Sequence, residues 1–263
     1  MSTAEENNTD DSSDDLAEGT LLSHLIELRG RLLKIAAAVV VVFVAMLPWA
    51  AEIFELVARP LLAVLPGEKM IATQVASPLL TPFKTTFYAA LFTAMPVVLY
   101  QVWAFVAPGL YLKEKRFAMP LLGSSIVLFY AGIAFAYFVV FPLIFGFFTA
   151  IAPDTVEVQP DIAQFLDFIT TIILAFGIAF EVPVATVLVV WTGLTTPQKL
   201  GKARPYVFLL AFVLGMFLTP PDFISQTLLA VPVYLLFEIG ILMSKIFVIK
   251  KNEESEEDPA TSD

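Results

Sequence analysis

Long uncharged stretches alternate with short charged segments along most of this chain. A helix needs about 20 mostly apolar residues to cross the ~30 Å hydrocarbon core of a bilayer. When flanking charges and Pro-Gly signals set the ends of each stretch, the pattern predicts six such helices. The predicted spans cover residues 32–52, 85–107, 117–142, 167–191, 205–219 and 224–244. The pattern therefore predicts an all-α membrane protein with six transmembrane helices.

Two of the predicted spans have unusual lengths. The stretch 117–153 is uncharged over 37 residues. At ~1.5 Å per residue it is too long for one crossing, yet it is too short for two crossings with a turn. We therefore expect one span that ends near Pro142, with the remainder projecting beyond the membrane. The span 205–219 is short for a full bilayer and requires local thinning or a dip.

The distribution of Lys and Arg between the two sides predicts the orientation. Basic residues near span ends favour the cytoplasmic side. The side with both termini and the segments 108–116 and 193–204 carries twelve Lys and Arg, whereas the other side carries three. This asymmetry supports an even number of crossings and predicts that both termini are cytoplasmic.

Composition agrees with a membrane location and sets the two ends of the chain apart. The chain is 58% hydrophobic and 15% charged, against about 45–50% and about 25% in soluble domains. The net charge of −10 comes from the ends, because residues 1–19 hold seven acids, residues 252–263 hold six, and neither segment has a base. We expect disordered acidic tails at 1–20 and 249–263 and a transmembrane domain at 21–248.

Most catalytic and cofactor-binding motifs are missing from the sequence. The chain has no Cys and its single His is His24, which excludes disulfides, thiolate metal sites and multi-histidine clusters. It contains no P-loop, no H-E-x-x-H and no G-x-S-x-G. The bases lie at membrane borders and form no nucleic-acid-binding patch. We expect no enzymatic activity, no cofactor and no metal, so the few acids of the transmembrane domain become informative.

Glu181 lies mid-way along the predicted span 167–191, two residues before Pro183. A carboxylate at this depth is costly unless it is protonated, paired or hydrated, so such a residue is a functional candidate. The proline removes a backbone donor and kinks the helix, which adds polarity at the same depth. The alternative is a neutral carboxyl that hydrogen-bonds a neighbouring helix as a structural contact.

Two acids are expected on the cytoplasmic side. Glu27 lies in an amphipathic stretch that leads into the first span, and Glu114 is the only acid in either cytoplasmic connecting loop. Each is either a solvated charge paired with a neighbouring Arg or Lys, or one of two carboxylates that receive guanidinium groups from a partner. Bidentate geometry would favour Arg over Lys in such a site.

Two polar residues mark the start of the last predicted span. Asp222 is expected to cap this helix, with or without a functional role. Gln226, one turn further along, is a polar group that would seek a partner across a helix interface in lipid.

The sequence resembles the TatC family, the multispanning subunit of the Sec-independent twin-arginine protein translocase. The resemblance covers residues 21–248, and its strength lies in the order and spacing of its segments. These segments are His24-Leu25-Ile26-Glu27-Leu28-Arg29, Met70-Ile71-Ala72-Thr73, Ser77-Pro78, Tyr100-Gln101-Val102-Trp103-Ala104-Phe105, Pro108-Gly109-Leu110-Tyr111, Phe141-Pro142, Phe180-Glu181-Val182-Pro183, Arg204-Pro205-Tyr206, Thr219-Pro220-Pro221-Asp222 and Ser225-Gln226.

The resemblance implies a glove-like concave bundle in the bacterial inner membrane. Such a protein binds the twin-arginine signal peptides of folded export substrates, works with the single-span partners TatA and TatB, and forms homo-oligomers within a complex driven by the proton gradient. The family's site positions fall on residues of this chain in three groups. They are Glu27, Arg29, Phe105 and Glu114 for the signal peptide, Glu181, Met216, Thr219 and Gln226 for the membrane-embedded partner surface, and Pro60 in the first periplasmic loop. Asp222 is a further structural or functional loop candidate, from its own place before the last span.

Two other functions stay open on the residues alone. A proton-coupled small-solute transporter would use Glu181 as its proton site and would transport without partners. An intramembrane hydrolase would need paired aspartates, or a Ser–His or metal set, at membrane depth. Only Glu181 and Glu238 are expected at that depth, and no His joins them.

Overall fold

The computed structural model describes residues 8–63, 70–106, 115–151, 153, 159–218 and 222–257. Within these ranges every regular element is a helix, and one isolated β-bridge joins Ile71 to Asp161. The elements in chain order are α1 (Asn8–Met46), the 3-10 helix η1 (Leu47–Trp49), α2 (Ala50–Leu62), α3 (Ser77–Thr93), α4 (Met95–Val106), α5 (Lys115–Phe135), the π-helix η4 (Ala136–Val140), α6 (Phe141–Ile151), α7 (Ile162–Ala179), α8 (Val182–Trp191), α9 (Pro197–Lys202), α10 (Arg204–Leu218) and α11 (Phe223–Glu257). The predicted all-α class is confirmed.

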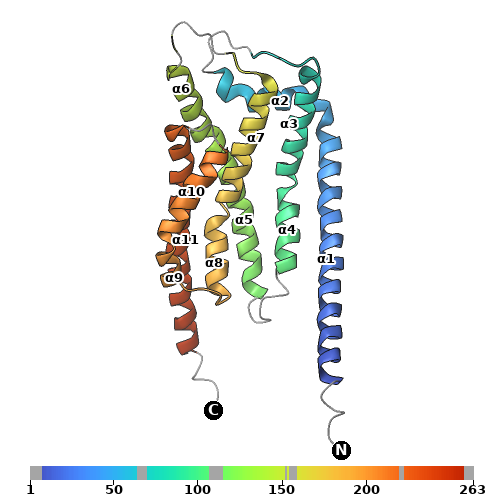
Figure 1. The fold of residues 1–263 in the computed structure, drawn as a ribbon, viewed down its shortest axis with the longest axis vertical. Helices are drawn as coiled ribbons and strands as arrows, with labels where there is room; N and C mark the ends of the chain where they lie inside the picture. Colours follow the sequence, from blue (N-terminus) through green and yellow to red (C-terminus); the bar gives the residue numbers. More distant parts are fainter. Residues whose placement is uncertain are drawn as a thin grey trace, which may run out of the picture.

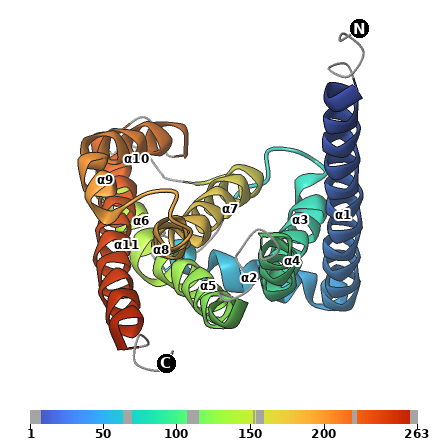
Figure 2. The ribbon, with the colours of Figure 1, turned by 90° about the horizontal axis from the view of Figure 1, so that it is seen from below.

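The helices form a row (Figure 1). Figure 2 shows α9, α10 and α11 at one end of the row, α5, α7 and α8 in the middle, and α1, α3 and α4 at the other end. The short helix α2 lies across one end of the bundle (Figure 1). The first turns of α1 and the last turns of α11 lie together at the end of the molecule away from α2 (Figure 1). An even number of crossings requires the two termini to lie at the same end.

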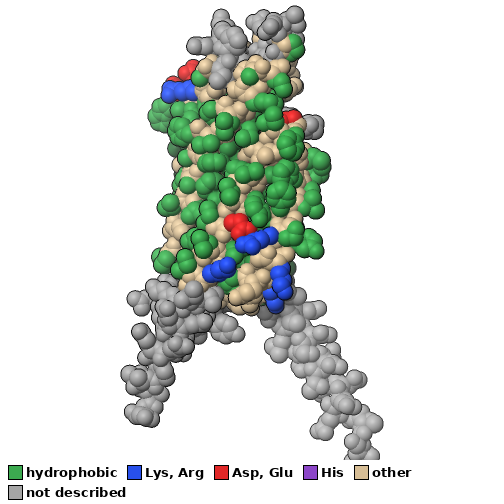
Figure 3. All heavy atoms as spheres, turned by 90° about the vertical axis from the view of Figure 1, so that its left-hand side faces the viewer, with side chains coloured by type: hydrophobic (Ala, Val, Ile, Leu, Met, Phe, Trp, Pro, Cys, Tyr) green, Lys and Arg blue, Asp and Glu red, His purple; other side chains and the backbone are tan. Residues whose placement is uncertain are grey.

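Four helical segments of the described chain are long and apolar enough to cross a membrane, and a bent helix pair makes a fifth if it counts as one span. Four are the helical segments Leu25–Leu62, Met119–Ile151, Ile162–Trp191 and Phe223–Ile246, and the fifth is the pair Ser77–Thr93 and Met95–Phe105, which bends by 48°. Arg204–Leu218 is apolar but shorter, and its 15 residues extend only ~22 Å at 1.5 Å per residue. The six-span count stays a prediction that depends on α10. Figure 3 shows apolar side chains over most of the height of one face.

The terminal helices continue into the predicted tails. α1 begins at Asn8 and α11 ends at Glu257, so each helix includes part of an acidic segment that the sequence predicts as disordered. The predicted boundaries of the transmembrane domain at residues 21 and 248 likewise stay predictions.

Two prolines, Pro60 and Pro96, each leave a helix carbonyl without its usual donor, and a tyrosine supplies the hydrogen bond in each case. A proline inside a helix leaves the carbonyl four residues earlier without its usual donor. Pro60 lies inside α2, and the carbonyl of Leu56 accepts a hydrogen bond from Tyr137 Oη at 2.7 Å. Pro96 lies just after the α3–α4 bend, and the carbonyl of Phe92 accepts one from Tyr130 Oη at 3.1 Å. Both tyrosines come from the α5–η4 segment, which therefore completes the hydrogen bonding of α2 and of the α3–α4 bend.

The main core lies where α2, η4 and α6 meet α7. It is rich in buried aromatic rings, and Phe141 and Phe145 stack with their ring centroids 5.6 Å apart. Helices α5 and α7 cross very closely, because a Cβ atom on Gly132 would lie 2.5 Å from the carbonyl oxygen of Phe176. Across the same contact, a Cβ on Gly177 would lie 2.6 Å from the Phe129 ring. Only glycine fits at these two positions without separating the helices.

Candidate functional site

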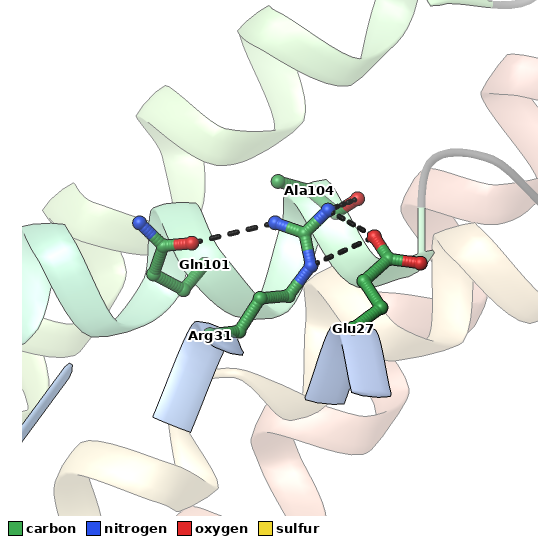
Figure 4. A network of polar contacts seen from close by, with 4 residues as sticks. All are labelled: Glu27, Arg31, Gln101 and Ala104. Atoms are coloured by element: carbon green, nitrogen blue, oxygen red, sulfur yellow. Dashed lines mark hydrogen bonds and ion pairs between the residues drawn. The ribbon is translucent and has the colours of Figure 1, made fainter. Parts of the chain in front are cut away.

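Glu27 on α1 is part of a polar network with the end of α4 (Figure 4). Arg31, one turn further along α1, donates from Nε to Glu27 Oε1 at 3.0 Å, and its Nη2 contacts the same oxygen. The same guanidinium donates from Nη2 to the carbonyl of Ala104 at 2.8 Å and from Nη1 to Gln101 Oε1 at 3.3 Å. Gln101 is buried. The network thus joins two helices through a single arginine.

The chemistry at the end of α4 explains why a cation is stable there. The last four carbonyls of a helix have no intrahelical donor, and that end carries partial negative charge. Ala104 is two residues before the end of α4 at Val106. Arg31 therefore satisfies an acceptor that the helix leaves open, while it neutralises Glu27.

Arg31 was not among the site residues predicted from the sequence, whereas its neighbour Arg29 was. Arg29 is exposed, and Arg31 is the residue that the structure places against Glu27. The spacing of four residues between Glu27 and Arg31 is the signal that identifies such a pair on a helix. That spacing does not reveal the contacts of Arg31 with α4, which come from residues 70 and 73 positions away.

Phe105 and Glu114 complete the predicted cytoplasmic group. Phe105 follows Ala104 on α4 and is half-buried. Glu114 lies outside the described residues. The structure therefore brings Glu27 and the end of α4 together, and leaves the position of Glu114 as a prediction.

Glu181 lies at the break between α7 and α8. α7 ends at Ala179 and α8 begins at Val182, with Pro183 in its first turn. The Oε1 atom of Glu181 is buried and has no hydrogen-bond partner among the described residues. On the α4 and α5 side, Trp103 Nε1 donates to the buried Ser125 Oγ at 3.2 Å. The apolar cluster of Trp103, Leu121 and Val184 brings α4, α5 and α8 together there.

A cavity of about 570 Å³ opens between α3, α7, α10 and α11. Most of its lining is apolar, and its polar residues are Tyr88 from α3 and Asp167, Thr170 and Thr171 from α7. Val182, the residue after Glu181, also lines it. The cavity can hold an apolar chain or side chains of a partner helix, and Glu181 lies next to it in sequence.

Gln226 and Met216 lie where α10 meets α11. Gln226 Nε2 donates to the carbonyl of Phe212 at 2.6 Å, which is the cross-helix partner that the sequence predicts for this amide. A Cβ on Gly215 would lie 3.0 Å from Gln226 Cγ, so the two helices approach closely here. Met216 is exposed, and Thr219 lies outside the described residues.

Asp222 caps α11, as its place before the helix predicts. Its Oδ1 accepts a hydrogen bond from the backbone N–H of Ser225 at 2.6 Å. Its Oδ2 and the hydroxyl of Ser225 are buried without a hydrogen-bond partner in the described part of the chain. The cap accounts for one carboxylate oxygen and leaves two polar atoms for a further interaction.

Asp161 is a connecting residue that the sequence did not single out. Its Oδ1 caps α7 by accepting from the N–H groups of Ala163 and Gln164 at 2.9 and 3.1 Å. Its Oδ2 accepts from the hydroxyl and the N–H of Thr73 at 2.7 and 2.8 Å. The Thr73 hydroxyl, and then the backbone N–H groups, stabilise the charged form and lower the pKa of Asp161 to about 2. We call this set of bonds the Thr73–Asp161 clasp.

The Sec-independent protein translocase protein (TatC) family matches residues 23–232 of the sequence. The chain belongs to the TatC family. The similar TatC protein of Azotobacter chroococcum mcd 1 is 57% identical, over 92% of this chain and 93% of the relative. The TatC protein of Escherichia coli (strain K12) is 55% identical, over 90% and 92%. The predicted family resemblance is confirmed.

The fold agrees with solved TatC structures. A crystal structure of the twin arginine translocase receptor TatC superposes with a TM-score of 0.76 at 36% identity, and covers 85% of this chain and 98% of the other. A second structure, described as TatC in DDM, gives a TM-score of 0.77 at 35% identity. This member of the TatC family is therefore a membrane protein and a component of the Sec-independent protein translocase.

Pro60 is the remaining TatC-family position predicted from the sequence. It lies inside the short helix α2. Its structural consequence is the carbonyl of Leu56, which Tyr137 satisfies from η4. The proline therefore fixes how α2 is attached to the rest of the bundle.

Proposed function

We propose that this protein is the core receptor subunit of the twin-arginine translocase, and that Glu27 and Glu114 bind the two arginines of a signal peptide on the cytoplasmic side. One observation carries the proposal: the Glu27 carboxylate lies where it already accepts a guanidinium, with Arg31 donating to it at 3.0 Å. A carboxylate in such a position suits the fork of donors on an arginine better than the single ammonium of a lysine.

The surroundings of Glu27 suit the rest of a signal peptide. Such peptides carry an apolar segment after their basic region. Leu25, Ile26 and Leu28 next to Glu27 are 62%, 64% and 44% exposed, and Phe105 is half-buried at the end of α4. Phe105 offers an apolar contact on the α4 side, while Leu25, Ile26 and Leu28 expose apolar surface on the other faces of α1.

The proposed partner surface runs from the α7–α8 break in the middle of the helix row to the α10–α11 end. We assign Glu181, Met216, Thr219 and Gln226 to contacts with single-span partners of the TatA and TatB type. The orphaned oxygen of Glu181 supports this part, because a buried polar atom in lipid favours a polar group on an arriving helix. The protein works as a homo-oligomer within that complex and not as an enzyme, and the proton gradient drives transport.

The location follows from the same proposal. The protein lies in the bacterial inner membrane, with both termini and the Glu27 network in the cytoplasm. The exposed basic residues Lys199, Lys202 and Lys245 on α9 and α11 belong to the same side under this orientation.

Charge removal at the two carboxylates tests the proposal. A labelled twin-arginine peptide is titrated into the purified full-length protein in mild detergent, and binding is followed by fluorescence anisotropy. Glu27→Gln and Glu114→Gln should each weaken binding about tenfold. Hydrogen bonds to charged groups contribute about 1.5–3 kcal/mol, and partial exposure of Glu27 favours the lower end.

The matched control is Glu52→Gln, because Glu52 is an exposed acid on α2 at the far end of the bundle. It should leave the affinity unchanged. Unchanged binding in both Glu27→Gln and Glu114→Gln would contradict the proposed site.

A further inference from the structure

Arg31 does more than form an ordinary surface ion pair. Exposed pairs four residues apart on a helix contribute little, because both side chains keep their freedom and water screens the charges. The Arg31 side chain is only 19% exposed, against 37% for Glu27. Besides Glu27, its guanidinium also reaches Gln101 and Ala104 on α4. A guanidinium with acceptors on two helices has one orientation, and so does the carboxylate it holds.

We propose that Arg31 is a positioning residue of the signal-peptide site. It holds the Glu27 carboxylate against the end of α4, and so sets the geometry at which twin-arginine peptides are preferred over twin-lysine peptides. This inference rests on the function proposed above.

The physical reason is pre-organisation. A free glutamate side chain loses rotamer freedom when a ligand orders it, and this loss weakens binding. Arg31 orders the carboxylate before the peptide arrives. A carboxylate in a fixed orientation binds the planar guanidinium of an arginine more tightly than the single ammonium of a lysine. A mobile carboxylate can adapt to either group, so it discriminates less between them.

The test compares peptide affinities of full-length variants. Arg31→Gln should weaken twin-arginine binding about tenfold, a coupling typical of residues in one network. The preference for twin-arginine over twin-lysine peptide should fall with it. Arg31→Lys should be intermediate, because an ammonium lacks the fork that spans Glu27 and α4. Lys34→Gln removes the same charge from an exposed position on α1 and should change nothing.

A double variant separates positioning from folding. In a Glu27→Gln background, Arg31→Gln should add less than about twofold, because it acts through Glu27. A full additional loss in that background would mean that Arg31 acts independently of Glu27 and would overturn the inference. Gln101→Leu, which removes one α4 acceptor, should weaken binding in the same direction. If Arg31→Gln does not fold, Gln101→Leu and Arg31→Lys together test the inference in its place.

The outcomes also distinguish this inference from the proposed function. If Glu27→Gln weakens binding but Arg31→Gln leaves it unchanged or strengthens it, the inference alone is overturned, and Arg31 competes with the peptide or is neutral. If Glu27→Gln itself has no effect, the proposed site fails and the inference fails with it.

Discussion

At the scale of single residues, the Thr73–Asp161 clasp joins two segments far apart in sequence. Thr73 and Asp161 are 88 positions apart. The backbone follows the same connection, since Ile71 N–H donates to Pro160 O at 3.1 Å and Ile162 N–H to Ile71 O at 2.9 Å. The carboxylate thus caps α7 and fixes the chain that leads into α3.

The clasp predicts a specific dependence of stability on pH. The pKa of Asp161 is about 2 in the folded protein, below the ~3.9 of an unfolded aspartate. Its stabilisation is therefore complete above about pH 4 and is lost as the pH falls towards 2. Asp161→Asn should lower the melting temperature by a few degrees at pH 7, and this difference should shrink below pH 4. Thermal unfolding in detergent across the pH range measures it.

The control for this experiment is Glu55→Gln. Glu55 is an exposed acid on α2, at the same end of the bundle. It should show no difference from the parent protein at pH 7. A difference for Asp161→Asn that is constant down to pH 2 would show that charge plays no part in the clasp.

At the scale of helices, the crossing of α5 and α7 depends on the absence of two side chains. The backbone of Phe176 lies against Gly132, so a methyl group at residue 132 has no space. In a lipid environment helices associate through close packing rather than through the hydrophobic effect, and small residues at the crossing make this possible.

Gly132→Ala should therefore destabilise the protein by about 1–3 kcal/mol, the usual cost of overpacking. Gly123→Ala is the matched control, because it lies on the same helix and its Cβ would meet nothing within 4 Å. Thermal unfolding of both variants in detergent should show a lower melting temperature than the parent protein for Gly132→Ala only. Equal melting temperatures would mean that the crossing relaxes without cost.

At the scale of the whole molecule, the number of crossings depends on α10. This helix extends ~22 Å, and it is fixed at its start by Arg204, whose Nε lies 2.7 Å from Glu238 Oε1 on α11. Figure 3 shows an acidic patch beside basic ones near one end of the apolar surface. A charged pair of this kind suits a membrane border, so α10 is expected to start at the cytoplasmic border.

Labelling of single cysteines can establish the topology, because the chain has none of its own. Leu194 and Phe223 flank α10 and are 78% and 75% exposed. In intact cells an impermeant maleimide should label Phe223→Cys and leave Leu194→Cys unlabelled. Ser13→Cys and Ser255→Cys near the termini should also stay unlabelled, and disrupted cells should label all four. If Leu194→Cys and Phe223→Cys are both labelled, or both unlabelled, in intact cells, then α10 does not cross the membrane.

The local features of this protein could be predicted from its sequence. In lipid a helix satisfies its backbone hydrogen bonds within the segment itself, so uncharged runs suffice to predict the helices, and Pro183 predicts the break between α7 and α8. The bend between α3 and α4 was not predicted. The helix cap formed by Asp222 and the cross-helix hydrogen bond of Gln226 were likewise predicted from residues that are close in sequence. The TatC resemblance follows from ordered motifs, which also depend on nearby residues only.

Contacts between distant segments were decided by the tertiary structure. Arg31 rather than Arg29 meets Glu27 and α4, Tyr137 satisfies the carbonyl that Pro60 frees, and Thr73 meets Asp161. Apart from the Glu27–Arg31 pair, whose spacing of four residues is visible in the sequence, the partners lie about 70 to 90 positions apart, and no periodicity connects them. The sequence by itself determined which segments are apolar helices that could enter the membrane and which acids are candidates, because transfer into lipid acts on each helix separately. The helix packing determined which side chains hold those acids in place, because that choice exists only once the helices are side by side.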